Sequence, residues 1–308
     1  MNSTPSSTLL AAIERNRKRL WGLCYRMTGS RHDADDLSQE AIARSIERED
    51  TLANHERLDG WLVRIATTVC LDHQRHQKIV RRVTDLADPL DDPELLPGVA
   101  PGPSPEAATI MKDDVRFAVI VALQRLSGRQ RAALILHDVC DYPLSEIADS
   151  LGTNANAAKA LVNRARTALA RSRHRIDVDP VADRGVVDRL VRAIALRSVD
   201  AVTELLDEEV WGIVDGGGVV QAAKKPTFGI RAVSRQWANA NRRLAVPLRA
   251  SIRRLNGEPA VVVALEGVAG AFVASIHVET RAGRIAALRI VRDPTKLQHL
   301  SAEKPTCH

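Results

Sequence analysis

The sequence predicts a multidomain chain: two all-α domains, the second with a helix-turn-helix, followed by an α+β domain. Apolar residues keep helical spacing through most of the first half, and a proline-rich stretch divides that half in two. Period-two alternation, typical of strands, dominates the C-terminal part. A chain of 308 residues is long enough for several separate cores. We therefore expect domains at 1–84, 108–176 and 182–300, with a proline-rich acidic linker at 85–107.

The first domain contains two clear helix patterns. The stretch from Asp33 to Arg48 has acids in its first turn, where they favour the positive end of the helix dipole, and Trp61 to Gln77 forms a second pattern. Asp36, Gln39 and Glu40 lie within about one helical turn, so they can form one acidic face for a basic partner helix. A merely solvated helix is the alternative.

Positive charge is concentrated in two blocks, on a chain of formal net charge +6. Trp61 to Arg82 is basic apart from Asp72, and Gly152 to Ile176 carries no acid at all. Arg64, Arg75 and other basic residues of the first block can neutralise phosphates, although a solvated basic face is the alternative. Such one-signed blocks favour a polyanion as partner.

The stretch from Tyr142 to Arg171 is typical of a helix-turn-helix. Gly152 follows a short apolar helix pattern at the place where a left-handed residue ends a helix at low cost, and Thr153 or Asn154 can cap the next helix. The polar face of that helix can meet phosphates and base edges in a major groove, which an ordinary helical hairpin would not require. This face comprises Asn154, Asn156, Lys159, Asn163, Arg164 and Arg166.

A different kind of sequence follows residue 180. The expected elements are a helical region at Val186–Leu206, a strand at Val210–Val214, a helix at Ile230–Ala240 and strands joined by turns at Asn256-Gly257 and Arg281-Ala282-Gly283. Two helices, a strand, a helix and four hairpin-linked strands predict an α+β domain with a curved sheet.

This last domain offers little that indicates catalysis. Asp215 and His277 are the obvious acid–base candidates, but a lone histidine in such a strand is expected on the solvent face and no second partner is evident. We therefore predict no catalytic residue. The aromatic residues of the domain are expected in its core rather than in a pocket: Trp211, Phe228, Trp237 and Phe272.

The four cysteines form no C-x-x-C pair, so neither a zinc site nor a disulfide framework is indicated. We expect no metal and no cofactor. The N-terminus lacks a signal core, and nowhere do about 18 apolar residues run together. The expectation is a soluble, cytoplasmic protein with no membrane partner.

Several motifs, in order, resemble the extracytoplasmic-function (ECF) group of bacterial RNA polymerase sigma factors. Asp33–Glu40 is similar to that family's polymerase-binding helix, D-A-E-D-L-x-Q-E, and Trp61–Arg75 to its W-L-x-R-I-A segment, which reads and melts the downstream promoter element. Leu126–Arg131 and Glu146–Gly152 resemble its second domain, which reads the upstream element.

The resemblance implies core RNA polymerase and promoter double-stranded DNA as partners. The residues it assigns to polymerase binding are Asp33, Asp36, Gln39 and Glu40. Those it assigns to the downstream element are Arg64, Thr68, Asp72, Arg75 and Lys78, although Asp72 can instead pair locally. The polar face of the helix-turn-helix would read the upstream element. Thr68 stands where the family pattern has Asn, and Ala160-Leu161 where relatives often have Ser-Arg.

Residues 182–293 resemble the SnoaL-like domain, an α+β cone that some sigma factors of this type carry at the C-terminus. Two short motifs carry this resemblance, Asp215–Gly218 and Arg292–Leu297, although Val219 stands where an Arg is usual. Three successive glycines suit a tight turn or a close backbone approach. We expect an intramolecular, regulatory contact with the sigma domains or their linker through Asp215, Gly216, Gly217, Gly218, Asp293, Pro294, Lys296 and Leu297.

Together these features predict an alternative sigma factor that is not an enzyme and whose C-terminal domain modulates its activity in cis. One alternative is a ligand-responsive helix-turn-helix regulator that acts without polymerase. The other is a SnoaL-like isomerase or hydrolase, which would need a substrate-sized cavity with paired acid–base groups. Whether a separate inhibitor protein exists is left open.

Overall fold

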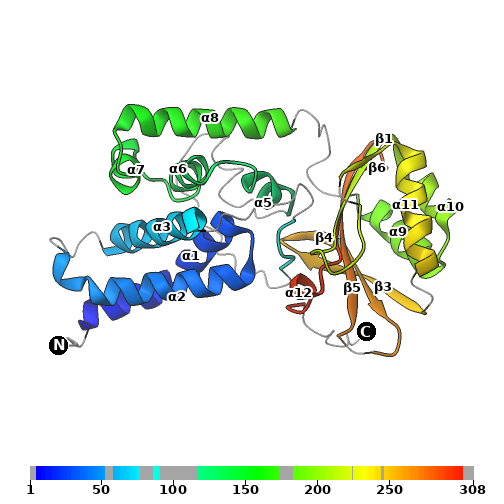
Figure 1. Ribbon diagram of the computed structural model, residues 1–308, viewed down its shortest axis with the longest axis horizontal. Coiled ribbons are helices and arrows are strands. Elements are labelled where there is room, and N and C mark those ends of the chain that lie inside the picture. The colour runs from blue at the N-terminus through cyan, green and yellow to red at the C-terminus, as the bar shows by residue number, and fades with distance from the viewer. Residues whose placement is uncertain are drawn as a thin grey trace. The chain divides into compact units, whose positions relative to one another are not determined.

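The computed structural model describes residues 5–52, 58–76, 86–90, 117–173, 183–223, 225–243, 246–268 and 270–300. These residues belong to two compact units. The first unit comprises Met1–Ile79 and Pro93–Ser172, and the second comprises Val80–Asp92 and Arg173–His308. The first is helical and the second is α+β, as the sequence predicts (Figure 1).

The N-terminal part of the first unit is built from α1 (Ser7–Thr28), α2 (Arg31–Glu47), the short 3-10 helix η1 (Glu49–Thr51) and α3 (Leu58–His76). Helices α1, α2 and α3 pack against one another around fully buried side chains such as Tyr25, Met27 and Leu62. Gly29 ends α1 in the left-handed conformation at φ 71°, and Ser30 caps α2 through a bond from the Asp33 backbone N–H. Both expected helices therefore exist and begin two to three residues early.

The C-terminal part of the first unit contains α5 (Phe117–Leu123), α6 (Gly128–Asp138), α7 (Leu144–Ser150) and α8 (Ala155–Arg173). Gly152 adopts φ 57° between α7 and α8, and the Asn154 side chain accepts the Ala157 backbone N–H at 2.8 Å. The predicted helix-turn-helix, with its glycine break and asparagine cap, is therefore confirmed. The greater part of the predicted linker, from residue 91 to 107, lies outside the described residues.

The second unit is a six-stranded sheet with helices. Its elements are α9 (Arg184–Ala195), α10 (Val199–Glu204), β1 (Leu206–Asp215), β2 (Thr227–Phe228), α11 (Ile230–Arg243), β3 (Leu248–Leu255), β4 (Glu258–Leu265), β5 (Phe272–Arg281), β6 (Arg284–Val291) and α12 (Pro294–Leu297). The strand order is β2-β1-β6-β5-β4-β3, and only the β1–β6 pair is parallel. Helices α9, α10 and α11 lie on one side of this sheet and α12 on the other (Figure 1).

Both predicted hairpin turns are present. Asn256 and Gly257 have positive φ between β3 and β4, as do Ala282 and Gly283 between β5 and β6, which suits two-residue hairpins. The helical prediction for Val186–Leu206 is wrong at its end, because Leu206 begins β1. The sequence did not predict β2 or α12, since two and four residues are too few to show a period.

Candidate functional site

The acidic face predicted on α2 is exposed to solvent. Asp36, Gln39 and Glu40 are all exposed, whereas Leu37 and Ala41 between and after them are buried. The surface carboxylates are paired within the helix, Asp36 with His32 at 3.3 Å and Glu40 with Arg44 at 2.5 Å. Such exposed pairs are weak, so they leave these side chains available to a partner.

Asp33 lies apart from this face. Its carboxylate is half-buried and faces the imidazole of His73 on α3 at 3.7 Å. Another acid of the same motif, Asp35, accepts a 2.6 Å bond from the Trp21 indole on α1. The structure therefore uses these two acids to join α2 to its neighbouring helices, a role the sequence did not predict.

The downstream-element residues predicted on α3 share one side of the helix at spacings of four, four and three residues. Arg64 and Arg75 are exposed, and Thr68 donates to the Arg64 carbonyl at 2.9 Å. Asp72 pairs with Arg75 at 2.9 Å, the local pairing that its position made possible. Lys78 lies outside the described residues.

The polar face of α8 has the exposure that a DNA-reading helix requires. Asn156, Lys159, Asn163 and Arg164 are exposed, while Ala158, Val162 and Ala165 are buried. None of the carboxylates that the structure describes forms an ion pair with Lys159 or Arg164. Their charges are therefore available to phosphates.

Arg166 differs from the other basic residues of α8. Its guanidinium binds the buried Asp138 carboxylate of α6 at 2.5 Å, and that hydrogen bond raises the pKa of Arg166. Arg166 therefore joins α8 to α6, which leaves it less charge for DNA than the sequence suggested. The signal that could have indicated this role is an acid at the C-terminal end of α6, where the helix dipole favours a cation.

Two arginines, for which the sequence predicted no contact, hold the second helical domain together. Arg129 donates to the Leu151 carbonyl at 2.8 Å, at the turn of the helix-turn-helix. Arg131 is buried and donates to the carbonyls of Leu123 and Leu126, which closes the end of α5 over the start of α6. The Ser127 and Gln130 capping box begins α6, so the whole L-S-x-x-Q-R motif is a helix junction.

In the second unit, Asp215 stands at the end of β1 and is only 1% exposed. Its carboxylate accepts the Lys296 ammonium at 2.8 Å, the Leu86 backbone N–H at 2.9 Å and the Gly217 backbone N–H at 2.9 Å. Lys296 also donates to the Leu86 carbonyl. The two predicted motifs therefore meet at one buried ion pair, and that pair holds a residue of the linker.

The linker segment of residues 86–90 is buried along its whole length. At its far end Leu90 and Asn256 form reciprocal bonds, from the Leu90 N–H to the Asn256 Oδ1 at 3.0 Å and from the Asn256 N–H to the Leu90 carbonyl at 2.7 Å. Asn256 was expected only as a hairpin turn. Its side chain is a second anchor for the linker, and the turn signal gave no indication of it.

The glycines after Asp215 allow a close approach of the backbone. A Cβ atom on Gly216 would lie 2.1 Å from the Val220 carbonyl oxygen, and one on Gly217 would lie 2.1 Å from the Asp293 carboxylate. Asp293 in turn caps α12, which begins at Pro294, by accepting the Thr295 N–H at 2.9 Å. A side chain at Gly217 would therefore push the two motifs apart.

His277 contradicts the expectation of a solvent-facing histidine, since it is only 3% exposed. Burial, with a smaller contribution from Arg289, lowers the pKa of His277 to about 3. The imidazole is therefore neutral near pH 7 and poorly suited to acid–base exchange there.

The aromatic residues of this unit were expected in its core. That expectation fails for Phe228, which is 64% exposed. Trp211 lies beneath the Arg289 guanidinium, which is 5.0 Å from the ring centre.

Other structural features bear on possible partners. Cys24, Cys70 and Cys140 are free thiols, and Cys307 lies outside the described residues. Within the described ranges, no cluster of three or more His, Cys, Asp or Glu side chains could hold a metal ion. Of the helices described, none is both long and apolar enough to span a bilayer.

Comparisons with known proteins agree with the helical architecture. Residues 12–79 match the family model for sigma-70 region 2, and residues 116–169 match that for sigma-70 region 4. The chain is 34% identical over 235 residues to the ECF RNA polymerase sigma factor SigG of Mycobacterium tuberculosis. This alignment covers 70% of this chain and 63% of SigG. The chain therefore spans less than two thirds of that relative's length.

Similarity to a second relative extends over the C-terminal domain. The chain is 33% identical over 294 residues to the ECF RNA polymerase sigma factor SigJ of M. tuberculosis, covering 93% of this chain and 92% of SigJ. The crystal structure of M. tuberculosis SigJ superposes with a TM-score of 0.70 at 28% identity, over 96% of this chain and 100% of that one.

Proposed function

Because the chain belongs to the ECF RNA polymerase sigma factors, we propose that it acts as an alternative sigma factor. In this role it binds core RNA polymerase, recognises two elements of promoter DNA and starts transcription in the cytoplasm. The observation that carries the proposal is the exposed polar face of α8, presented by a complete helix-turn-helix in a chain that also has an exposed acidic face on α2. A repressor would need only the first of these faces.

Polymerase binding is assigned to Asp36, Gln39 and Glu40, because these are the exposed members of the motif. Asp33 has a positioning role, since its carboxylate faces His73 of α3. The partner surface would be basic, with charge complementarity setting orientation and association rate.

Promoter contacts divide between two helices. Arg64 and Thr68 on α3 would meet the downstream element, with Arg75 contributing less because Asp72 compensates its charge. Asn156, Lys159, Asn163 and Arg164 on α8 would meet the upstream element, with amides suited to base edges and cations to phosphates. Arg166 would act mainly through α6.

Control in cis is assigned to the linker segment of residues 86–90. Lys296 and Asp215 hold one end of it and Asn256 the other, all within the second unit. The two sigma domains lie on either side of this linker in sequence. When the segment is held, the chain between the domains is effectively shorter, and when it is released they can move further apart. A protein truncated after Pro180 should therefore differ from the full chain in polymerase affinity and transcription; equal behaviour of the two would contradict control in cis.

The direct test is transcription in vitro with core polymerase on a library of genomic promoters. We expect start-site-specific transcripts from the wild-type protein and a loss of about tenfold or more for Lys159→Ala combined with Asn163→Ala. Arg125→Ala is the matched control, because Arg125 is an exposed cation outside the helix-turn-helix. Absence of any specific transcript from the wild type would overturn the proposal.

Polymerase binding can be measured separately by co-elution with core enzyme. Asp36→Arg and Glu40→Arg should weaken it, whereas Glu14→Arg on the exposed side of α1 should not. A gel shift adds a second criterion. Tight and specific promoter binding by the isolated chain, unchanged by core enzyme, would favour a regulator that acts without polymerase.

A further inference from the structure

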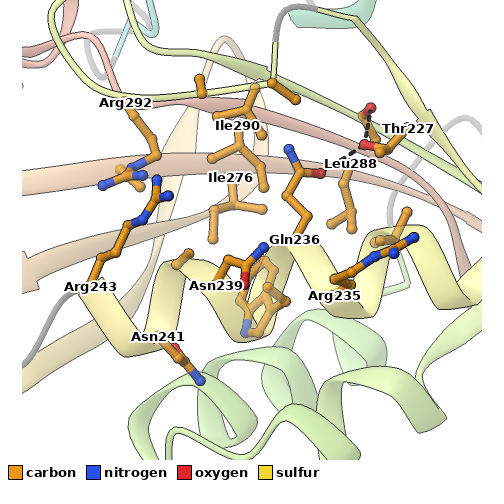
Figure 2. A pocket seen from close by; sticks show the side chains of 18 of the residues that line it. Thr227, Arg235, Gln236, Asn239, Asn241, Arg243, Ile276, Leu288, Ile290 and Arg292 are labelled. Atoms are coloured by element: carbon orange, nitrogen blue, oxygen red, sulfur yellow. Dashed lines mark hydrogen bonds between the residues drawn. The ribbon is translucent and has the colours of Figure 1, made fainter.

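The second unit contains a cavity of about 410 Å³ between the sheet and α11. Its volume falls in the range of about 300–1,000 Å³ usual for small-molecule sites. Figure 2 shows Ile276, Leu288 and Ile290 directed into it from the strands. The strand side of the cavity is therefore largely apolar, and most of its polar side chains come from α11.

Of the three arginines that line this cavity, Arg243 at the end of α11 and Arg292 just after β6 form a pair, and Arg235 lies apart from them. The guanidinium groups of the pair lie next to each other in Figure 2. Over the ranges the structure describes, neither forms an ion pair with a carboxylate. Burial, and then the charge of Arg243, lower the pKa of Arg292, as expected for two cations facing one another in a partly desolvated site.

Amide groups lie beside the arginines along α11. Gln236 reaches the cavity and accepts a 2.7 Å bond from the Thr227 hydroxyl, which fixes its orientation. Asn239 lines the cavity one turn further along, between Gln236 and Arg243. Donors therefore follow the α11 side of the cavity, with the paired arginines at one end and Arg235 toward the other, whereas the described lining residues include no acid.

We infer that this cavity binds an apolar small molecule carrying one oxyanion group, with Arg243 and Arg292 holding the oxyanion and the strand side chains enclosing the apolar body. Guanidinium groups match carboxylate and phosphate geometry, and an anion between two like charges removes their mutual repulsion. Binding at this site does not depend on transcription, so its test stands apart from that of the proposed function.

The first experiment uses the full chain and a matched pair of probes, decanoate and 1-decanol, below the concentrations at which they aggregate. Both have the same apolar length and differ in the charged group. Isothermal titration calorimetry should give one site for decanoate and binding at least about tenfold weaker for 1-decanol. Decyl phosphate, added as a third probe, shows whether a carboxylate or a phosphate is preferred.

Substitutions then assign the charge. Arg292→Met and Arg243→Met keep an unbranched apolar stem without the guanidinium group and should each weaken decanoate binding by about tenfold or more. Arg231→Met is the control, since Arg231 is exposed at the other end of α11 and outside the cavity lining. The probe comparison uses the wild-type protein and remains decisive even if a variant fails to fold.

Three results would overturn the inference: no binding of any probe, equal affinity for decanoate and 1-decanol, or decanoate affinity unchanged in both folded arginine variants. Quenching of tryptophan fluorescence gives an independent readout, because Trp237 lines the cavity. Decanoate affinity that is lost in Arg292→Met but kept in Arg231→Met would support the inference.

Discussion

The linker contact of the second unit predicts a specific change in local stability when Lys296 is replaced by Met. The substitution removes the cation from the buried Asp215 carboxylate and the bond from its ammonium to the Leu86 carbonyl. Asp215 still accepts the Leu86 and Gly217 backbone N–H groups, so the segment retains a geometry in which it can bind. In the variant, the linker segment would bind beside the buried Asp215 carboxylate, which has lost its counter-ion.

The cost can be estimated from burial. Removing one partner of a buried ion pair costs about 3–5 kcal/mol. The Lys296 side chain is 20% exposed and that of Asp215 is 2% exposed, which favours the lower end, about 3 kcal/mol. When the linker segment detaches, water can reach Asp215, so the penalty falls mainly on the closed state. A loss of about 3 kcal/mol corresponds to an opening equilibrium increased roughly a hundredfold.

Native-state hydrogen exchange measures this opening directly. The Leu86 amide proton, which is bonded to Asp215, should exchange about a hundredfold faster in Lys296→Met than in the wild type. Lys225→Met is the control, because Lys225 is an exposed lysine of the same unit. The Leu90 amide, held by Asn256, reports whether the segment opens as a whole.

A change of less than about threefold at Leu86, in a variant whose sheet amides remain protected, would refute the energetic argument. The double variant Asp215→Asn with Lys296→Met provides a further check. It replaces the charged pair by neutral groups and should recover part of the loss, since no uncompensated charge remains.

Three further predictions concern other charged groups. The folded pKa of His277, about 3, lies below its unfolded value of about 6.5, so the unfolded chain binds more protons between those values and stability is lost as pH falls through that window. Between pH 7 and pH 4.5 the wild type should lose about 2 kcal/mol more than His277→Gln in the opening energy of β5 amides, and parallel pH profiles would contradict this. In the helix-turn-helix, Lys159→Ala should weaken promoter binding and reduce its salt dependence without lowering the melting temperature. Arg166→Ala should instead lower thermal stability, because it removes the guanidinium from the buried Asp138 carboxylate and leaves that carboxylate beside the His137 imidazole; an unchanged melting temperature would argue against that ion pair.

The helix-turn-helix was predictable because its signals are local. Gly152 ends one helix through its own backbone conformation, and Asn154 caps the next through a bond to a residue three positions away. The same holds for the hairpin at Asn256-Gly257. Each of these features depends on a few consecutive residues, so no knowledge of the tertiary structure was needed.

His277 shows where local signals fail. Period-two alternation separates it correctly from Ile276 and Val278, which belong to the core on the helix-covered face. Whether the opposite face is solvated depends on what covers it, and α12, which packs against β5, is too short to show a period. The structural roles of Arg131 and Asp33 were missed for a related reason, because both side chains have partners on other helices.

The cavity and the linker contact meet at β1, whose Val214 lines the cavity and whose Asp215 holds the linker segment, yet they can be separated by mutation. The backbone N–H of Arg292 donates to the Asp215 carbonyl at 2.7 Å, while its guanidinium lines the cavity. Arg292→Met therefore alters the cavity and leaves that backbone bond in place, whereas Lys296→Met alters the linker contact and leaves the lining unchanged. If the two sites are independent, the effects on decanoate affinity and on Leu86 exchange should be additive in the double variant. A departure from additivity would mean that both sites respond to one equilibrium, and linkage would then require each to affect the other equally.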